Sequence, residues 1–255
     1  MKGHIADYTD FSLELDPVKP NDPFRRTYIR LSYIPRLHMK FGLEKAPIGL
    51  EELLSTARLP FVDRSEVNDR FAAAEEVGVH LESRWDHWLF QFAVTNGGRR
   101  LLRDDNDAKD VSGRIVWAPT RWLSVGAAAL QGKRGPNSEE RDRYNIEFKL
   151  GSMLRGFQSE VYRAKDIGVW STAFYTAAFW NFPVRAGRPI HLQPVARYEY
   201  VGRSDDLRAE ELSLLTVGVS VLLEGHASKF QLNYLKDLRG GFSEDVLRVQ
   251  WQVEF

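Results

Sequence analysis

Apolar and polar residues alternate with a period of two along nearly the whole chain, and this pattern most narrows the folds open to it. From Leu247 to Phe255 every second residue is apolar, and the residues between are Arg, Gln, Gln and Glu. The stretches 37–44, 144–150 and 215–221 alternate in the same way. Successive side chains of a β-strand point to opposite faces, so each stretch predicts a strand with one apolar and one polar face. The chain is therefore expected to be all-β.

The number and spacing of these segments favour a transmembrane antiparallel β-barrel. From Phe11 to the C-terminus we count about fourteen strands of roughly ten residues, a length that crosses a bilayer at a tilt. Tight connections at 34–36, 83–86 and 119–121 alternate with long, charged ones at 97–109 and 131–143. The tight turns are flanked by tryptophans, where an interfacial aromatic girdle is expected; they are Trp85, Trp88, Trp117 and Trp122. A soluble β-sandwich also has polar outer faces and stays open as an alternative.

Composition excludes several other classes. No run approaches the roughly 18 to 20 apolar residues of a membrane helix, whereas alternating strands have unremarkable mean hydropathy. The chain has no cysteine and therefore no disulfide framework. Its formal net charge of zero gives no global electrostatic reason to expect nucleic-acid binding. The opening MKGHIADYTDF contains no apolar signal-peptide core, so an exported protein would be represented here by a mature form or a fragment.

One region, residues 46–74, breaks the alternation. It is too long for a turn, contains Pro47 and Pro60, and includes a helix-like piece at 50–56. Long ordered loops usually carry function. Within a barrel, such a loop can fold inward and narrow the lumen.

Three segments resemble the phosphate-selective porin O and P family in order and spacing. They are KFGLEKAPIGLEELLSTARLPFVDRS at 40–65, EEVGVHLESRWDHWLFQFAVTNG at 75–97 and NDAKDVSGRIVWAP at 106–119. The resemblance implies a 16-stranded outer-membrane barrel that assembles as a homotrimer in lipid. It also implies a water-filled channel for passive diffusion of small ions and solutes, narrowed by the loop at 46–74. On this reading, residues 1–255 form one barrel domain.

Two departures from the family bear on selectivity. The first recognisable strand, near 10–16, resembles the family's third, so the opening hairpin with its arginine-rich inner face is expected to be missing. Lys40 matches one lysine of the family's anion site, but the second lysine position falls on Glu52. A carboxylate there opposes phosphate binding. We therefore expect a channel with weak ion discrimination.

Strand parity and the loop supply the candidate pore-lining residues. The strand candidates are Arg30, His38, Lys40, His80, Arg114, Lys149, Arg197, Lys229 and Arg248. The loop candidates are Glu52, Arg58, Arg64 and Arg70, with Asp63, Glu66 and Asp69 among them. The inward carboxylates are expected to be Glu14, Glu82, Glu147, Glu160, Glu199 and Glu254. Such mixed charge is expected mainly to solvate a wet lumen and to pair across strands.

Other functions receive less support. None of the six histidines lies in a nucleophile elbow or a two-histidine metal motif, so no enzyme, metal site or cofactor is expected. A non-conducting surface barrel and a soluble β-barrel binding protein share most features of the pattern. Channel conductance would distinguish the first, and detergent dependence of solubility the second.

Overall fold

The computed structural model describes residues 1–16, 23–98, 106–152, 154–185, 189–203, 212–223, 226–239 and 245–253. Most of them lie in strands: β1 (Lys2–Ala6), β2 (Thr9–Ser12), β3 (Thr27–Ile34), β4 (Leu37–Lys45), β5 (Glu75–Trp85), β6 (Trp88–Thr95), β7 (Asp110–Thr120), β8 (Leu123–Arg134), β9 (Glu139–Gly151), β10 (Gly156–Asp166), β11 (Val169–Phe179), β12 (Phe182–Arg185), β13 (Pro189–Arg203), β14 (Leu212–Leu222), β15 (Ser228–Asp237) and β16 (Val246–Val253).

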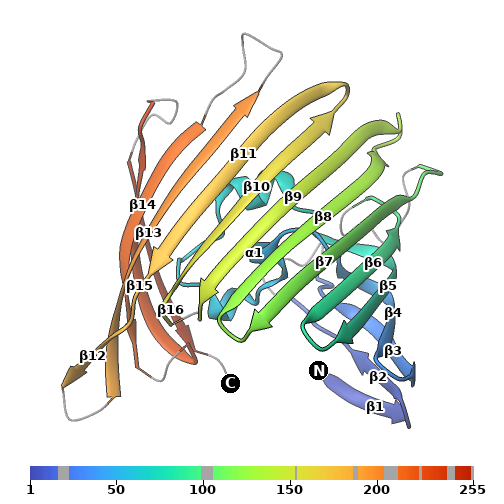
Figure 1. Cartoon of the computed structure of the whole chain (residues 1–255), viewed down its shortest axis with the longest axis horizontal. Helices are drawn as coiled ribbons and strands as arrows, with labels where there is room; N and C mark the ends of the chain where they lie inside the picture. The colour runs from blue at the N-terminus through green and yellow to red at the C-terminus, as the bar shows by residue number, and fades with distance from the viewer. Residues whose placement is uncertain are drawn as a thin grey trace.

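The strands form one antiparallel 16-stranded sheet that curves into a barrel-like wall (Figure 1). Neighbours along the chain pair in order from β1 to β16, except that β11 pairs with β13 and the short β12 pairs only with β13. Among the described residues, no pairing joins β1 to β16. The all-β prediction is confirmed.

The strand count extends the sequence-based estimate at the N-terminus. From β2, which contains Phe11, to β16 there are fifteen strands, one more than the estimate, and β1 precedes them in a short hairpin with β2. The sequence reading missed β1 because KGHIA does not alternate clearly, and it placed the next strand at 10–16, whereas β2 ends at Ser12.

The two faces of the sheet differ as the alternation predicts. Large apolar side chains on the outside are exposed, such as Ile146 at 63% and Val249 at 56%. Polar side chains on the inside are buried, such as Gln231 on β15 at 0%. Exposed apolar side chains on strand after strand are what a lipid-facing wall requires. The fold thus has a polar interior and an apolar exterior, the opposite of a soluble protein.

The predicted tryptophans gather at the tight-turn end of this wall. Trp85 pairs across the β5–β6 hairpin with Trp88, and Trp88 pairs with Trp117 on β7, their ring centroids 6.4 Å apart. Trp122 lies in the next tight turn and is 52% exposed. Amphipathic rings at one level of an apolar wall suit a membrane interface.

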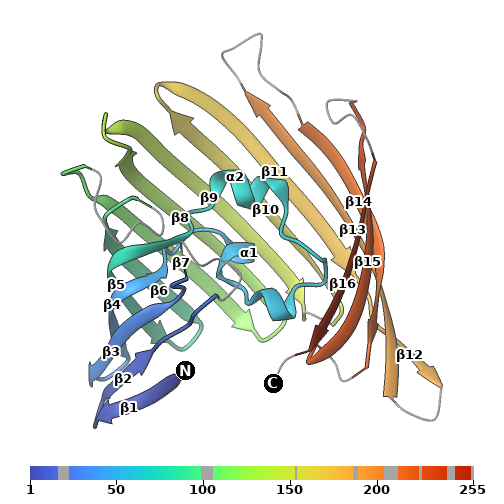
Figure 2. The ribbon, with the colours of Figure 1, turned by 180° about the vertical axis from the view of Figure 1, so that it is seen from behind.

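Residues 46–74 connect β4 to β5 and lie on the concave side of the sheet (Figure 2). They contain α1 (Leu50–Leu53), a 3-10 turn η1 (Thr56–Arg58) and α2 (Glu66–Phe71). The expected helix at 50–56 therefore ends early. The sequence reading missed α2, whose first turn is capped by Ser65 through a 3.0 Å bond from the Asn68 N–H. None of the helices among the described residues is long and apolar enough to cross a membrane.

Close strand approach at Gly78 leads to a prediction about stability. A Cβ added there would lie 2.8 Å from the Cα of Thr95. Because this is a backbone atom, the clash can be relieved only if the neighbouring strand moves. We expect Gly78→Ala to lower the free energy of unfolding by about 1 to 3 kcal/mol, the usual cost of overpacking. Heat-modifiable electrophoretic mobility in detergent measures this as a lower conversion temperature. Gly113→Ala is the matched control, since the nearest atom to its added Cβ is 3.9 Å away. Equal conversion temperatures for the two variants would contradict the close approach at Gly78.

Candidate functional site

The 46–74 loop crosses the interior and is fastened to strands far along the chain. The carbonyl of Leu59 accepts a 2.7 Å hydrogen bond from Lys229 Nζ on β15, and that of Ala57 accepts a 3.1 Å bond from Gln252 on β16. The Val62 N–H donates to Asn233 Oδ1 at 2.7 Å. The loop backbone therefore uses wall side chains as hydrogen-bond partners, which a buried irregular segment requires.

Two wall carboxylates bond the loop helices directly. Glu160 on β10 accepts the N–H groups of Leu50 at 2.9 Å and Glu51 at 2.8 Å. Glu199 on β13 accepts the N–H of Glu66 at 2.6 Å. Both glutamates are 0% exposed. The expectation that they solvate a wet lumen is wrong for these two, because the loop covers them.

The opposite side of the interior is more open. On β3 to β6, the side chains of Arg30, Lys40, Glu82 and Arg84 keep relative exposures of 40%, 18%, 21% and 65%. By contrast, most inward-facing side chains of β10 to β15, on the side where the loop lies, are buried. The inward side chains that keep some exposure thus lie on β3 to β5, although Glu44 and Glu76 on the same strands are buried.

Most of the predicted inward cations have an acidic partner. Arg30 donates through Nε to Asp10 at 2.9 Å, and Lys40 donates to Glu44 at 2.7 Å. The remaining pairs are Arg114–Glu147 at 2.5 Å, Arg197–Glu199 at 2.7 Å, Arg64–Glu52 at 3.4 Å, Arg70–Glu66 at 3.8 Å and Arg248–Asp63 at 3.0 Å. The predicted charge pairing therefore extends over strands and loop alike.

Glu52 lies within a compact charge cluster of the loop. Its carboxylate is 3.4 Å from Lys45 Nζ and 3.4 Å from Arg64 Nε, and it accepts a 3.0 Å bond from Asn68 Nδ2. Lys45 and Arg64 also reach the carbonyl of Leu54 at 3.4 and 3.0 Å. The carboxylate at this position thus neutralises two cations that converge on it.

Other candidates have different surroundings. Among the described residues, Lys149 and Arg58 have no acidic partner; Lys149 is half-buried on β9, and Arg58 is exposed at the end of η1. His38 bonds Ser32 Oγ at 2.8 Å, and His80 bonds the carbonyl of Glu76 at 3.2 Å. In the same described part of the chain, no three His, Asp or Glu side chains form a group that could hold a metal ion.

The remaining predicted carboxylates lie in different environments. Glu14 was expected on a strand facing the lumen, but it lies beyond the end of β2 and is exposed. Glu82 is on the inner face of β5, where it accepts from Gln91 at 2.9 Å. Glu254 lies outside the described residues. Within the loop, Asp69 is exposed, yet partial desolvation and, to a smaller extent, the nearby Glu66 carboxylate raise its pKa above the ordinary value.

The sequence-based prediction did not include Arg141, a buried cation on the inner face of β9. Arg141 donates to Glu76 on β5 at 3.0 Å and to Asp110 on β7 at 3.2 Å, and it is 2% exposed. Residues 131–143 were expected to form a charged connection, whereas β8 continues to Arg134 and β9 begins at Glu139. The continued alternation of Arg141, Arg143 and Asn145 was the signal that could have revealed these positions.

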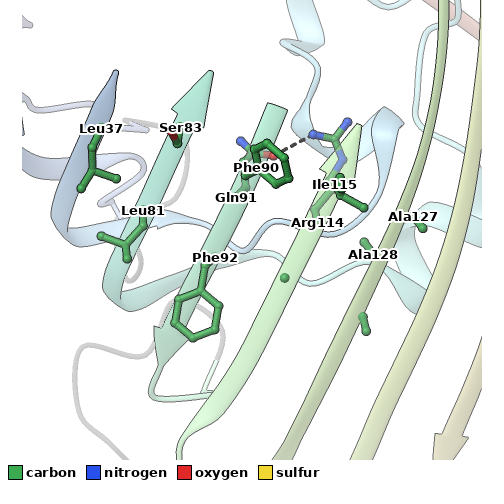
Figure 3. Close-up of a pocket in the computed structure, with 12 residues that line it drawn as sticks. Leu37, Leu81, Ser83, Phe90, Gln91, Phe92, Arg114, Ile115, Ala127 and Ala128 are labelled. Atoms are coloured by element: carbon green, nitrogen blue, oxygen red, sulfur yellow. Dashed lines mark hydrogen bonds between the residues drawn. The ribbon is translucent and has the colours of Figure 1, made fainter. Parts of the chain in front are cut away.

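A shallow hollow of about 550 Å³ lies on the outside of the wall, not in the interior. Its lining includes Gly113, Ala127 and Ala129. Phe90 and Phe92 of β6 also line it (Figure 3). In the same view, the Arg114 side chain extends to Gln91, to which it donates at 2.7 Å. The hollow is therefore a feature of the apolar outer surface and is separate from the charged interior.

Comparison with solved structures supports the barrel architecture. OmpT of Vibrio cholerae in its trimer form is 11% identical with a TM-score of 0.60, over 92% of this chain and 78% of that one. An anion-selective porin from Comamonas acidovorans is 12% identical with a TM-score of 0.60, over 99% and 82% of the two chains. A porin refined at 1.8 Å is 9% identical with a TM-score of 0.61, over 98% and 88%. At these identities the likeness concerns the fold.

The sequence comparison supplies the family. No curated protein matches the chain. Residues 2–154, well over half of the 255, match the family described as phosphate-selective porin O and P. This range includes β1 to β9, the 46–74 loop and the three segments whose order and spacing indicated the resemblance. The chain therefore belongs to the phosphate-selective porin O and P family and is an outer-membrane β-barrel channel for passive diffusion.

Proposed function

We propose that residues 1–255 form one barrel domain whose 46–74 loop constricts the pore, and that this pore conducts small ions with weak charge discrimination. The observation that carries the proposal is the pairing of inward cations with carboxylates on both wall and loop. Around the more open side, Lys40 and Arg26 share Glu44, at 2.7 Å each, and Arg84 pairs with Glu82 at 3.0 Å. Paired charges leave a weak net potential along the path.

The same pairing opposes strong phosphate selectivity. Capture of phosphate in a pore needs several charge-assisted donors that converge on one anion. At the loop, the donors that converge are Lys45 and Arg64, and the Glu52 carboxylate already occupies the place between them. Phosphate would have to compete with a carboxylate that is covalently held at the site.

We extend two further properties to this chain. The OmpT relative forms a trimer, and we propose a homotrimer embedded in outer-membrane lipid. We also propose that the chain has no catalytic role and passes solutes unchanged, because its inward polar side chains are engaged with one another and with the loop backbone.

Planar-bilayer recordings test this function. We expect ohmic channels whose reversal potential in a potassium chloride gradient stays near zero, and whose chloride current is unaffected by millimolar phosphate. Tight block by phosphate would contradict weak selectivity. The absence of any conductance from correctly folded protein would indicate a structural surface barrel in place of a channel.

A further inference from the structure

Two buried carboxylates hold the loop against the wall opposite the open path. Glu160 receives the first two N–H groups of α1, and Glu199 receives the Glu66 N–H of α2 at 2.6 Å and the Val67 N–H at 3.4 Å. Each glutamate is on a different strand, β10 or β13, so the two bonds fix both helical parts of the loop.

Glu160 is itself held in one orientation. Its carboxylate accepts from the hydroxyl groups of Tyr162 at 3.0 Å and Tyr175 at 2.8 Å, and from Asn145 Nδ2 at 3.1 Å. Both tyrosines are 0% exposed. The loop approaches this cluster so closely that a Cβ at Gly49 would clash with the Tyr162 hydroxyl, and Gly49 has a φ of +88° that favours glycine. The sequence thus provides both the acceptor and the space for the contact.

Glu199 belongs to a second cluster that joins the two helical parts. Arg197 donates to Glu199 at 2.7 Å and to the carbonyl of Asp63 at 3.0 Å, and it also lies 3.4 Å from the Glu51 carboxylate. Glu51 in turn accepts the Ser65 hydroxyl at 2.6 Å. A shift of α1 or α2 would therefore disturb the buried hydrogen-bond network formed by Arg197, Glu199 and Glu51.

We propose that Glu160 and Glu199 are positioning residues of the channel, which clamp the constriction loop to β10 and β13 and so keep the path along β3 to β6 at one width. This inference rests on the proposed constriction role of the loop.

At position 160 a glutamine would place its amide N–H₂ against one of the two loop N–H groups, because each Glu160 oxygen accepts one of them. At position 199 one oxygen accepts both loop N–H groups and the other accepts from Arg197, so a glutamine would place its N–H₂ either against the loop or against Arg197 and would disturb the second cluster in both cases. A buried donor left without an acceptor destabilises the contact. The contact between the neighbouring loop helix and the wall is then weakened, and the helix is expected to detach part of the time.

The experiment compares Glu160→Gln and Glu199→Gln with Glu147→Gln in single-channel recordings. Glu147 is 2% exposed and bonds Arg114 through both oxygens, but among its described contacts none is with the loop. We expect several conductance levels and severalfold higher open-channel noise in the first two variants. The Glu147→Gln channel should keep a single level, even though all three variants lose thermal stability. Glu160→Asp, which keeps a carboxyl group as the hydrogen-bond acceptor, should have less open-channel noise than Glu160→Gln.

A single unmodified conductance level in both Glu160→Gln and Glu199→Gln would overturn the positioning role, and so would equal noise in the Glu147→Gln control. If one of the two variants does not fold, the other tests the same statement at its own helix. Failure of the constriction role itself is detected separately. Because Lys45 and Glu75 pair directly, residues 48–72 can be replaced by a short turn, and unchanged conductance after that replacement would refute the constriction and not merely the clamps.

Discussion

Arginine at Val249 or Val219 is expected to lower the free energy of unfolding by about 2 to 4 kcal/mol, the cost of a charged side chain near the middle of the lipid-facing wall. Both residues face outward, and both pair with Leu232, which places them in one row across β14 to β16. Val249 is 56% exposed, so a guanidinium there would point toward lipid. Urea-dependent unfolding in lipid vesicles measures the difference.

The control for this prediction is Gln250→Arg, on the inward face of the same strand. Gln250 pairs with Gln231 and is only half-buried, so an arginine there can extend into the wet interior. Ser220 is a poorer control, although it has the same parity, because it is 0% exposed and donates to the carbonyl of Pro60 on the loop. Equal losses at Val249 and Gln250 would mean that the two faces of β16 are assigned the wrong way round.

Glu52→Lys is expected to raise the preference of the channel for anions. The substitution would remove the carboxylate that neutralises Lys45 and Arg64 and add a third positive charge between them. Each unit charge is worth about 1 kcal/mol at 4 Å in bulk water, and more where the surroundings are less polar. We expect a severalfold rise in the chloride-to-potassium permeability ratio, read from reversal potentials, together with new block by phosphate.

Two further variants bracket this effect. Glu52→Gln removes one charge without adding another and should give an intermediate shift. Lys40→Glu should change selectivity toward cations, because it leaves two carboxylates, at positions 40 and 44, beside Arg26. If neither Glu52→Lys nor Lys40→Glu moves the reversal potential, the ions pass through a part of the interior remote from both residues.

The strand faces could be predicted from the sequence because a period of two is a local property. Val249 and Gln250 fall on opposite faces in any strand, whatever surrounds it. The loop at 46–74 was equally visible, since it interrupts that period and contains two prolines. Its boundaries agree with the end of β4 at Lys45 and the start of β5 at Glu75.

The roles of the inward residues could not be predicted in the same way. Parity places Glu160 and Glu82 on the same inner face, yet Glu160 is fully buried beneath the loop and Glu82 keeps about a fifth of its side chain exposed, at 21%. What distinguishes them is contact with a segment more than 100 residues away, as shown by the 110-residue separation between Leu50 and Glu160. Alternation shows which way a side chain points, but not what lies in front of it.

The fastening of the loop also constrains the order in which the channel can assemble. The loop's wall partners follow it by 109 residues for Glu51 and Glu160, and by 195 residues for Ala57 and Gln252. Contacts so distant in sequence form only after a large loop-closure entropy has been overcome, which makes them late and slow to form. A chain ending before β10 would lack every one of these acceptors and donors. Until β10 and the later strands are in place, the loop would lack the contacts that hold it against the wall.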